Sequence, residues 1–165
     1  MLVKKVPFLI LLLCVCVSGC GDSVDSQISN ATKHNIRKVA IMYMVYSSAN
    51  KFVGPKDEAE FKAWIQGDPS RKERLERFGI NTDEFDSYMV SDRTGDKFEI
   101  RWGVKSAPMA PAYPVAFEPN AVDGVRHVGM AGGETREVSD DDEYNDLWEG
   151  KVTPDDSEGA ERGNS

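Results

Sequence analysis

The sequence of 165 residues predicts an α+β domain in which helices come first and an antiparallel sheet follows. Apolar residues in the first half of the chain recur at spacings of three and four, which is typical of helices with one buried side. In the second half the period changes to two, which indicates strands. We therefore expect an amino-terminal helix and two short helices packed on a small antiparallel sheet of about five strands.

The first residues have the layout of a secretory signal, with two basic residues, an apolar core and small residues before a cysteine. Lys4 and Lys5 precede the apolar core, which covers residues 6–17. This core is about a dozen residues long, whereas a membrane-spanning helix needs about 20, so a cleaved signal is favoured over a transmembrane helix. We expect residues 1–19 to be a signal peptide.

Residues 26–50 are expected to form the first helix of the domain, because nothing in them breaks a helix and apolar residues recur at helical spacing. Over residues 39–46 the apolar side chains go all the way round, so we expect the rest of the domain to enclose that half. A second helix is predicted after Asp57, which forms a capping-box arrangement with Glu60. A third is expected to begin near Pro69.

Five strands are expected in the second half of the chain, over residues 88–91, 97–102, 115–118, 125–130 and 135–138. In the second of these, Phe98, Ile100 and Trp102 alternate with charged residues, so one face of the sheet is expected to be buried and the other to face water. We expect the buried face to pack against residues 39–46, with Trp148 from a last helix closing this core.

A last short helix is expected after Ser139, which forms a second capping arrangement with Asp142. The segment that follows this helix is acidic and has few apolar side chains, which predicts disorder. The expected organisation is a signal peptide over residues 1–19, a linker over 20–26, a single α+β domain over 27–150 and a disordered acidic tail over 151–165.

The segment Val17, Ser18, Gly19 and Cys20 resembles the lipobox of bacterial lipoproteins. The resemblance implies that the thiol of Cys20 receives a diacylglyceryl group, that the chain is cut before Cys20 and that the new amino terminus is acylated. Two or three acyl chains, at about 0.8 kcal/mol per buried methylene, hold a protein stably on a membrane. We therefore expect a lipid-anchored protein of the bacterial cell membrane, on its periplasmic or surface side, with Cys20 as the lipidation site in a lipidated linker.

Two further segments carry a resemblance of the domain itself. Residues 34–55, HNIRKVAIMYMVYSSANKFVGP, resemble the pilin-like helix that runs into a Gly-Pro exit, and residues 115–142, VAFEPNAVDGVRHVGMAGGETREVSDDD, resemble its closing hairpin. In this order of elements the chain is similar to the major pseudopilins of type II secretion. The segment that resembles a lipobox stands where those proteins have a membrane-embedded helix. The resemblance implies a pilin-like fold and a subunit of a secretion or envelope assembly.

Charge and cysteine content restrict the partners. The formal net charge is -8, and nucleic-acid binding needs clustered Lys and Arg to neutralise phosphates, so we expect no nucleic-acid partner. Cys14 and Cys16 would leave with the signal peptide, and Cys20 would be occupied by lipid. The mature domain is therefore expected to fold without disulfides.

Most nucleophile and base pairs, and a zinc site, would have to use His34 or His127, because the chain has two histidines. We expect His34 to be a solvated residue of the first helix. His127 precedes Val128 in a strand, so it is expected to face water if Val128 faces the core. The two lack the spacing of a zinc motif and would have to meet in space to bind a metal. We predict no catalytic residue, no metal site and no cofactor.

Other candidate patterns have structural explanations. The acidic residues 140–143 lack the glycine-containing loop of a calcium site and complement the dipole of a helix start. Residues 129–133 are rich in glycine but lead into a strand, which predicts a hairpin turn and not a phosphate cradle. Trp64, Trp102 and Trp148 could line a groove, but each falls on an expected core face.

The function expected from these observations is that of a non-enzymatic interaction or scaffolding module on the cell envelope. Its partners would be the membrane, through the lipid on Cys20, and an unknown envelope protein. The alternative is a pseudopilin-like subunit of a secretion or envelope assembly. A more distant alternative is an envelope hydrolase, since an acidic chain always offers some pair of carboxylates.

Overall fold

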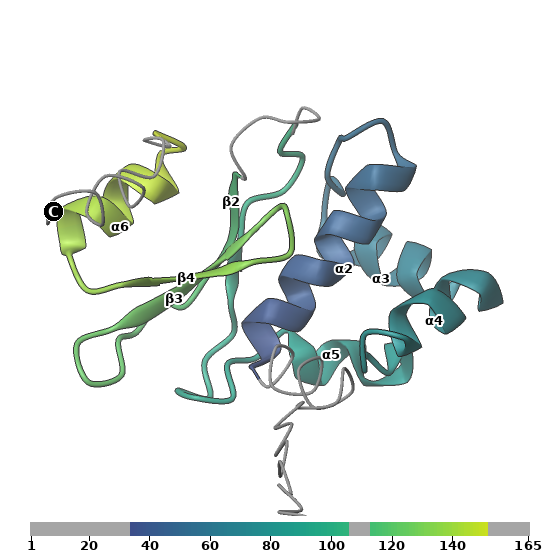
Figure 1. Cartoon of the computed structure of the whole chain (residues 1–165), viewed down its shortest axis with the longest axis horizontal. Coiled ribbons are helices and arrows are strands. Elements are labelled where there is room, and N and C mark those ends of the chain that lie inside the picture. The colour runs from purple at the N-terminus through teal and green to yellow at the C-terminus, as the bar shows by residue number, and fades with distance from the viewer. Residues whose placement is uncertain (1–33, 106–112, 152–165) are drawn as a thin grey trace, which may run out of the picture.

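The computed structural model describes residues 34–105 and 113–151, which form helices, then an antiparallel sheet and one last helix (Figure 1). The helices are α2 (Asn35–Ala49), α3 (Glu58–Gln66), α4 (Pro69–Glu76), the 3-10 helix η1 (Thr82–Glu84), α5 (Phe85–Tyr88) and α6 (Asp141–Trp148). The strands are β1 (Glu99–Ile100), β2 (Pro114–Phe117), β3 (Arg126–Met130) and β4 (Thr135–Val138). The predicted α+β class is confirmed for these residues. The predicted signal peptide, Cys20 and residues 152–165 of the predicted tail lie outside them.

Two helices begin at the residues that the sequence marks as caps. The side chain of Asp57 accepts a hydrogen bond of 2.8 Å from the backbone N–H of Glu60 and so starts α3. Pro69 is the first residue of α4, where its missing N–H removes no helical hydrogen bond. These two predicted helices are confirmed. α2 occupies the described part of the first predicted helix, and residues 26–33 of that prediction lie outside the described ranges.

The sheet contains four strands in the order β1-β2-β3-β4 within the described ranges, each antiparallel to its neighbour. The expectation of five strands is wrong because the first of them, over residues 88–91, begins inside a helix. The side chain of Asn81 accepts a hydrogen bond from the backbone N–H of Asp83 and starts η1, and α5 continues this helical path. Val90 then pairs with Lys97 as an isolated bridge.

α2 packs directly against one face of the sheet. Gly129 of β3 permits this close approach, because a Cβ there would lie 3.2 Å from the backbone oxygen of Ile36 and 3.3 Å from the Cβ of Ala40. Residues 39–46 are buried, except that Met44 is partly exposed. The prediction that the rest of the domain encloses this half of the helix is confirmed.

The sheet separates two apolar clusters, with α2 on one face and α6 on the other (Figure 1). Phe98, Ile100 and Trp102 belong with α2 to the larger cluster, as predicted. The buried members of the smaller cluster are Phe117, Val128, Met130, Val138 and Leu147. The predicted core position of Trp148 is wrong, because α6 covers the opposite face of the sheet. Trp148 is 41% exposed, and its ring packs on Phe117 with centroids 4.9 Å apart.

Candidate functional site

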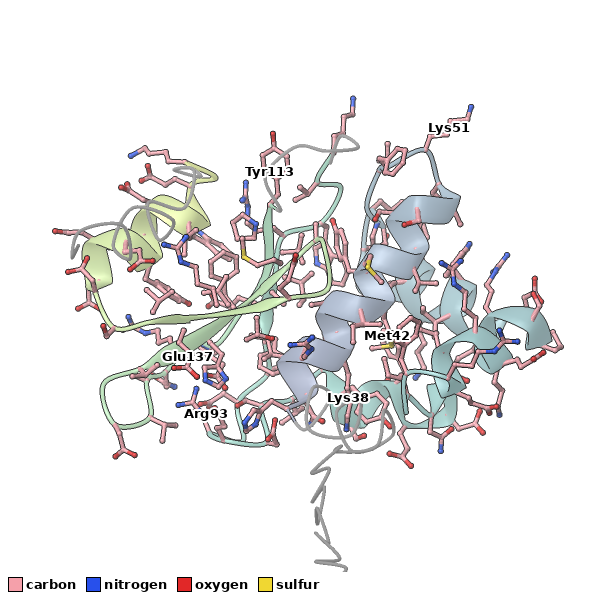
Figure 2. All side chains as sticks on the ribbon, in the orientation of Figure 1. Lys38, Met42, Lys51, Arg93, Tyr113 and Glu137 are labelled. Carbon is pink, nitrogen blue, oxygen red and sulfur yellow. The ribbon has the colours of Figure 1, made fainter. Side chains whose placement is uncertain are left out.

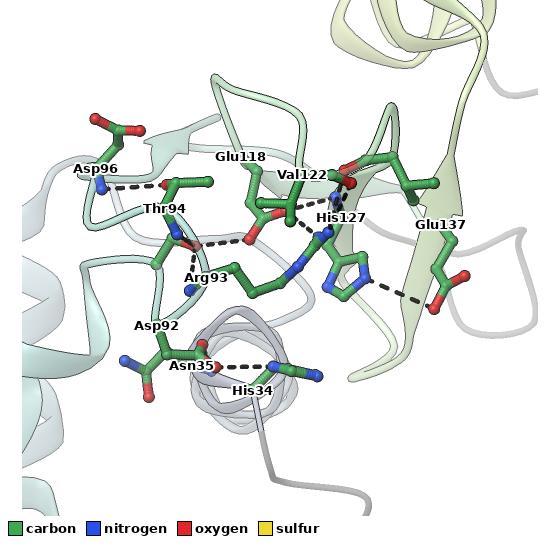
Figure 3. Close-up of polar contacts among 12 residues, drawn as sticks. His34, Asn35, Asp92, Arg93, Thr94, Asp96, Glu118, Val122, His127 and Glu137 are labelled. Atoms are coloured by element: carbon green, nitrogen blue, oxygen red, sulfur yellow. Dashed lines mark hydrogen bonds and ion pairs between the residues drawn. The ribbon is translucent and has the colours of Figure 1, made fainter.

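The strongest candidate for a functional site is a polar cluster beside the start of α2 (Figure 3). Its charged and imidazole members, named here the His–Glu cluster, are His34, Asp92, Arg93, Glu118, His127 and Glu137. Figure 2 shows Arg93 and Glu137 on the same side of the molecule as the start of α2. Titratable groups that are buried together are enriched at functional sites, so this cluster is the first place to look for chemistry.

Glu118, which follows β2, is the buried centre of the cluster and is 1% exposed. One carboxylate oxygen accepts a hydrogen bond of 2.7 Å from the hydroxyl of Ser91. The other accepts from Nη1 of Arg93 at 2.6 Å and from the backbone N–H of His127 at 2.9 Å. A buried carboxylate is tolerated only when such partners replace water. Both oxygens are engaged within the domain, so Glu118 is arranged as a structural support and not as a free general base.

Arg93 ties this carboxylate to the turn between β2 and β3. Its side chain is 15% exposed, and Nη1 forms the ion pair with Glu118. Nη2 donates to the backbone oxygens of Val122 and Val125, at 3.4 and 3.2 Å. The planar guanidinium suits this role, because it presents several donors in a fixed arrangement. The pair therefore holds the turn after α5 against the turn between β2 and β3.

His127 lies on β3 beside this ion pair and is 7% exposed. Its Nε2 lies 3.6 Å from a carboxylate oxygen of Glu137 on β4, while its Nδ1 has no hydrogen-bond partner in the part of the chain that the structure describes. Burial lowers the pKa of His127, and the positive charge of Arg93 lowers it further. The carboxylates of Glu118 and Glu137 act in the opposite direction but do not reverse the shift.

His34 and Asp92 complete the cluster at the start of α2. Nδ1 of His34 lies 2.8 Å from one oxygen of Asp92, and the other oxygen accepts from the backbone N–H of Asn35 at 2.8 Å. The first backbone N–H groups of a helix have no partner within the helix, and Asp92, in the turn after α5, accepts a hydrogen bond from one of them. Burial tends to raise the pKa of Asp92, but the hydrogen bonds from Asn35 and His34 outweigh it and the pKa is lowered. The rings of His34 and His127 meet edge to face, with centroids 5.3 Å apart.

The environments of both histidines differ from those predicted. His127 does not face water, because both faces of the sheet are covered and alternation with Val128 therefore places it under α2. His34 has a side chain that is 39% exposed, yet it contacts both Asp92 and His127. The two rings therefore meet in space although their spacing in the sequence is not that of a zinc motif.

Sequence reasoning missed Glu118 and Arg93. The signal for Glu118 is its position directly after the apolar residues 115–117, in a segment predicted to be a strand. A charged residue that continues a buried strand needs a partner of opposite charge. Arg93 gave no comparable signal, because charged residues in turns are usually solvated.

The acidic residues before α6 start a helix. The side chain of Asp140 accepts a hydrogen bond of 2.8 Å from the backbone N–H of Glu143, so the cap lies one residue after the predicted Ser139. Aspartate caps a helix as well as serine does, which explains the shift. Asp141 forms an ion pair with Arg126 at 2.6 Å. The predicted role of these acidic residues at a helix start is confirmed.

The predictions for the glycine-rich segment and for two tryptophans are also confirmed. Gly133 has a φ of 91° in the turn that joins β3 to β4, a conformation that favours glycine. Trp64 and Trp102 are partly buried and pack against the larger apolar cluster. These residues are explained by the fold.

Across residues 34–105 and 113–151, no group of three or more His, Cys, Asp or Glu side chains is placed to hold a metal ion. The helices of those same ranges include none that is long and apolar enough to cross a membrane. No protein-family model matches the chain, and neither a curated protein nor a solved structure matches it significantly. The interpretation of this site therefore rests on the geometry of the His–Glu cluster alone.

Proposed function

We propose that this chain is a lipid-anchored protein of the bacterial cell envelope and serves there as a non-enzymatic interaction or scaffolding module. The observation that carries the proposal is the lipobox-like segment ending at Cys20, after a short apolar stretch. Lipid on Cys20 would hold the domain on the periplasmic or surface side of the membrane. Its protein partner would be another component of the envelope.

The His–Glu cluster supports a structural role for the domain. Glu118 and Arg93 satisfy each other and several backbone groups, so their charges hold turns together. Asp92 performs a similar task at the start of α2. A general base would need an oxygen directed at a bound substrate, whereas these oxygens are directed at groups of the domain. This arrangement favours a rigid module over an envelope hydrolase.

Labelling with radioactive palmitate tests the lipid anchor. The full chain should incorporate the label, and Cys20→Ser should abolish incorporation and leave a soluble or uncleaved protein. Cys16→Ser is the matched control, because that thiol precedes the expected cleavage point, and it should be labelled like the unmodified chain. Label entering Cys20→Ser would contradict the proposal.

Crosslinking in the native membrane, followed by mass spectrometry, tests the interaction role. We expect one envelope protein to be crosslinked reproducibly to the domain and to be lost when Cys20→Ser releases the chain from the membrane. Absence of any crosslinked protein, together with turnover of a glycan, ester or phosphate substrate, would contradict a non-enzymatic module.

A pseudopilin-like subunit is the second candidate, and the packing of α2 against an antiparallel sheet favours it. Such a subunit should assemble with copies of itself. Electron microscopy of the full-length protein would show filaments if this alternative holds, and monomers in sizing experiments would count against it.

A further inference from the structure

Two histidines that are far apart in the sequence touch where α2 meets the sheet (Figure 3). The ring centroids of His34 and His127 lie 5.3 Å apart, and the ring planes are inclined at 67°. His34 directly precedes α2, so it stands where the chain that follows Cys20 enters the described domain. The contact therefore joins this point of entry to β3.

Charged groups from every neighbouring element surround His127. They are Arg93 in the turn after α5, Glu118 after β2, Glu137 on β4 and the ring of His34 at the start of α2, which itself contacts Asp92. Two of the carboxylates already have cationic or imidazole partners, since Asp92 contacts His34 and Glu118 binds Arg93. The side chain of Glu137 is 75% exposed, so water weakens its attraction for a charged imidazole.

A proton on His127 would therefore be costly in the closed arrangement. It would place a positive charge at a residue that is 7% exposed, beside the guanidinium of Arg93 and the ring of His34. The protonated ring would also donate from Nδ1, an atom with no hydrogen-bond partner among the described residues. Separation of the ring from its neighbours, so that water can reach it, relieves both costs.

We propose that the contact between His34 and His127 is an acid-sensitive latch, which holds the start of α2 on the sheet while the His127 ring is neutral and releases it when that ring is protonated. Its use in the cell rests on the proposed envelope function, because an envelope protein is exposed to the acidity of the surroundings. The latch itself needs no lipid. A failed palmitate test and a failed latch test are therefore distinguishable.

The direction of the effect follows from proton binding. The folded state holds the pKa of His127 below the unfolded value of about 6.5, so the unfolded chain binds more protons over that interval. The free energy of unfolding therefore falls as the pH drops from about 6.5 towards the folded pKa, and it is restored above about 6.5. Asp92 acts in another range, because its pKa is lowered and its contribution is lost only below about pH 4.

Hydrogen exchange on the full-length protein at about pH 7.5 and about pH 5 tests the latch. The amides to follow are those of Asn35 and Lys38, which donate to Asp92 and to the backbone oxygen of His34. Their protection, corrected for the intrinsic effect of pH, should fall severalfold in the unmodified chain, because the lowered pKa of His127 makes protonation favour the open arrangement. In His127→Asn and His127→Phe it should change by less than about twofold.

His34→Gln is the matched variant, because it removes one ring of the pair and leaves His127 beside Arg93. A smaller fall in protection than in the unmodified chain supports the pair, and an undiminished fall overturns it. Amides of α3 are the internal reference, and an equal loss there would show general unfolding and overturn a local latch. Equal protection of these amides at the two pH values in the unmodified chain would also overturn the latch.

An NMR titration of the unmodified protein covers the case in which both His127 variants fail to fold. A midpoint for the His127 ring below about 6.5 supports the latch. A midpoint at or above that value overturns it, because protonation would then stabilise the closed arrangement.

Discussion

Among single residues, Glu118 should be the least replaceable member of the His–Glu cluster. Glu118→Ala would leave the guanidinium of Arg93 buried without its counter-charge and the hydroxyl of Ser91 without its acceptor. Breaking a buried ion pair from one side costs about 3 to 5 kcal/mol, so the free energy of unfolding should fall by that amount. Urea denaturation followed by circular dichroism measures this change.

Glu137→Ala is the control for that prediction. Glu137 belongs to the same cluster, but its side chain is 75% exposed. Ion pairs of exposed groups contribute about 0 to 1 kcal/mol, so this variant should unfold close to the midpoint of the unmodified chain. Equal losses of unfolding free energy in Glu118→Ala and Glu137→Ala would show that the burial of a carboxylate does not determine how much it contributes to stability.

At the scale of elements, the distance between α2 and the sheet depends on the absence of a side chain at Gly129. In Gly129→Ala the new Cβ would press on Ala40 and on the backbone of Ile36. Overpacking of a closed core typically costs about 1 to 3 kcal/mol, and we expect a loss of unfolding free energy in that range. Thermal unfolding monitored by circular dichroism provides the measurement.

A neighbouring glycine offers the matched control. In Gly132→Ala the new Cβ would meet the end of the Glu134 side chain, which is flexible and can move aside. The melting temperature of this variant should stay near that of the unmodified protein. A larger fall in melting temperature in Gly132→Ala than in Gly129→Ala would contradict the close packing of α2 on the sheet at Gly129.

Local sequence signals predicted some elements well and others poorly. Asp57 and Pro69 mark helix starts through groups that lie within a few residues, so these elements could be predicted. Residues 88–91 are β-prone in composition, yet η1 and α5 precede them and lead the chain through a helical turn. Short apolar segments are ambiguous for this reason, since their neighbours decide their conformation.

At the scale of the whole molecule, the two apolar clusters on opposite faces of the sheet should differ in stability. The smaller one depends on α6, whose buried anchor is Leu147. Leu147→Ala should cost about 2 to 5 kcal/mol locally and speed hydrogen exchange in α6 and β4, while the amides of α2 keep their protection. Asn145→Ala, at an exposed position of α6, should leave exchange unchanged. Uniform loss of protection over α2 and α6 would show that the clusters unfold as one.

The sequence by itself determined the order of helices and strands, the starts of α3 and α4 and the enclosure of residues 39–46, because each depends on period and on neighbours along the chain. Only the tertiary structure decided that the residues of the His–Glu cluster lie together. Packing covers both faces of the sheet and so buries His127, and it places His34, Asp92 and Glu118 side by side although they come from distant parts of the chain. Alternation along a strand says which side chains share a face, whereas only packing decides whether that face meets water.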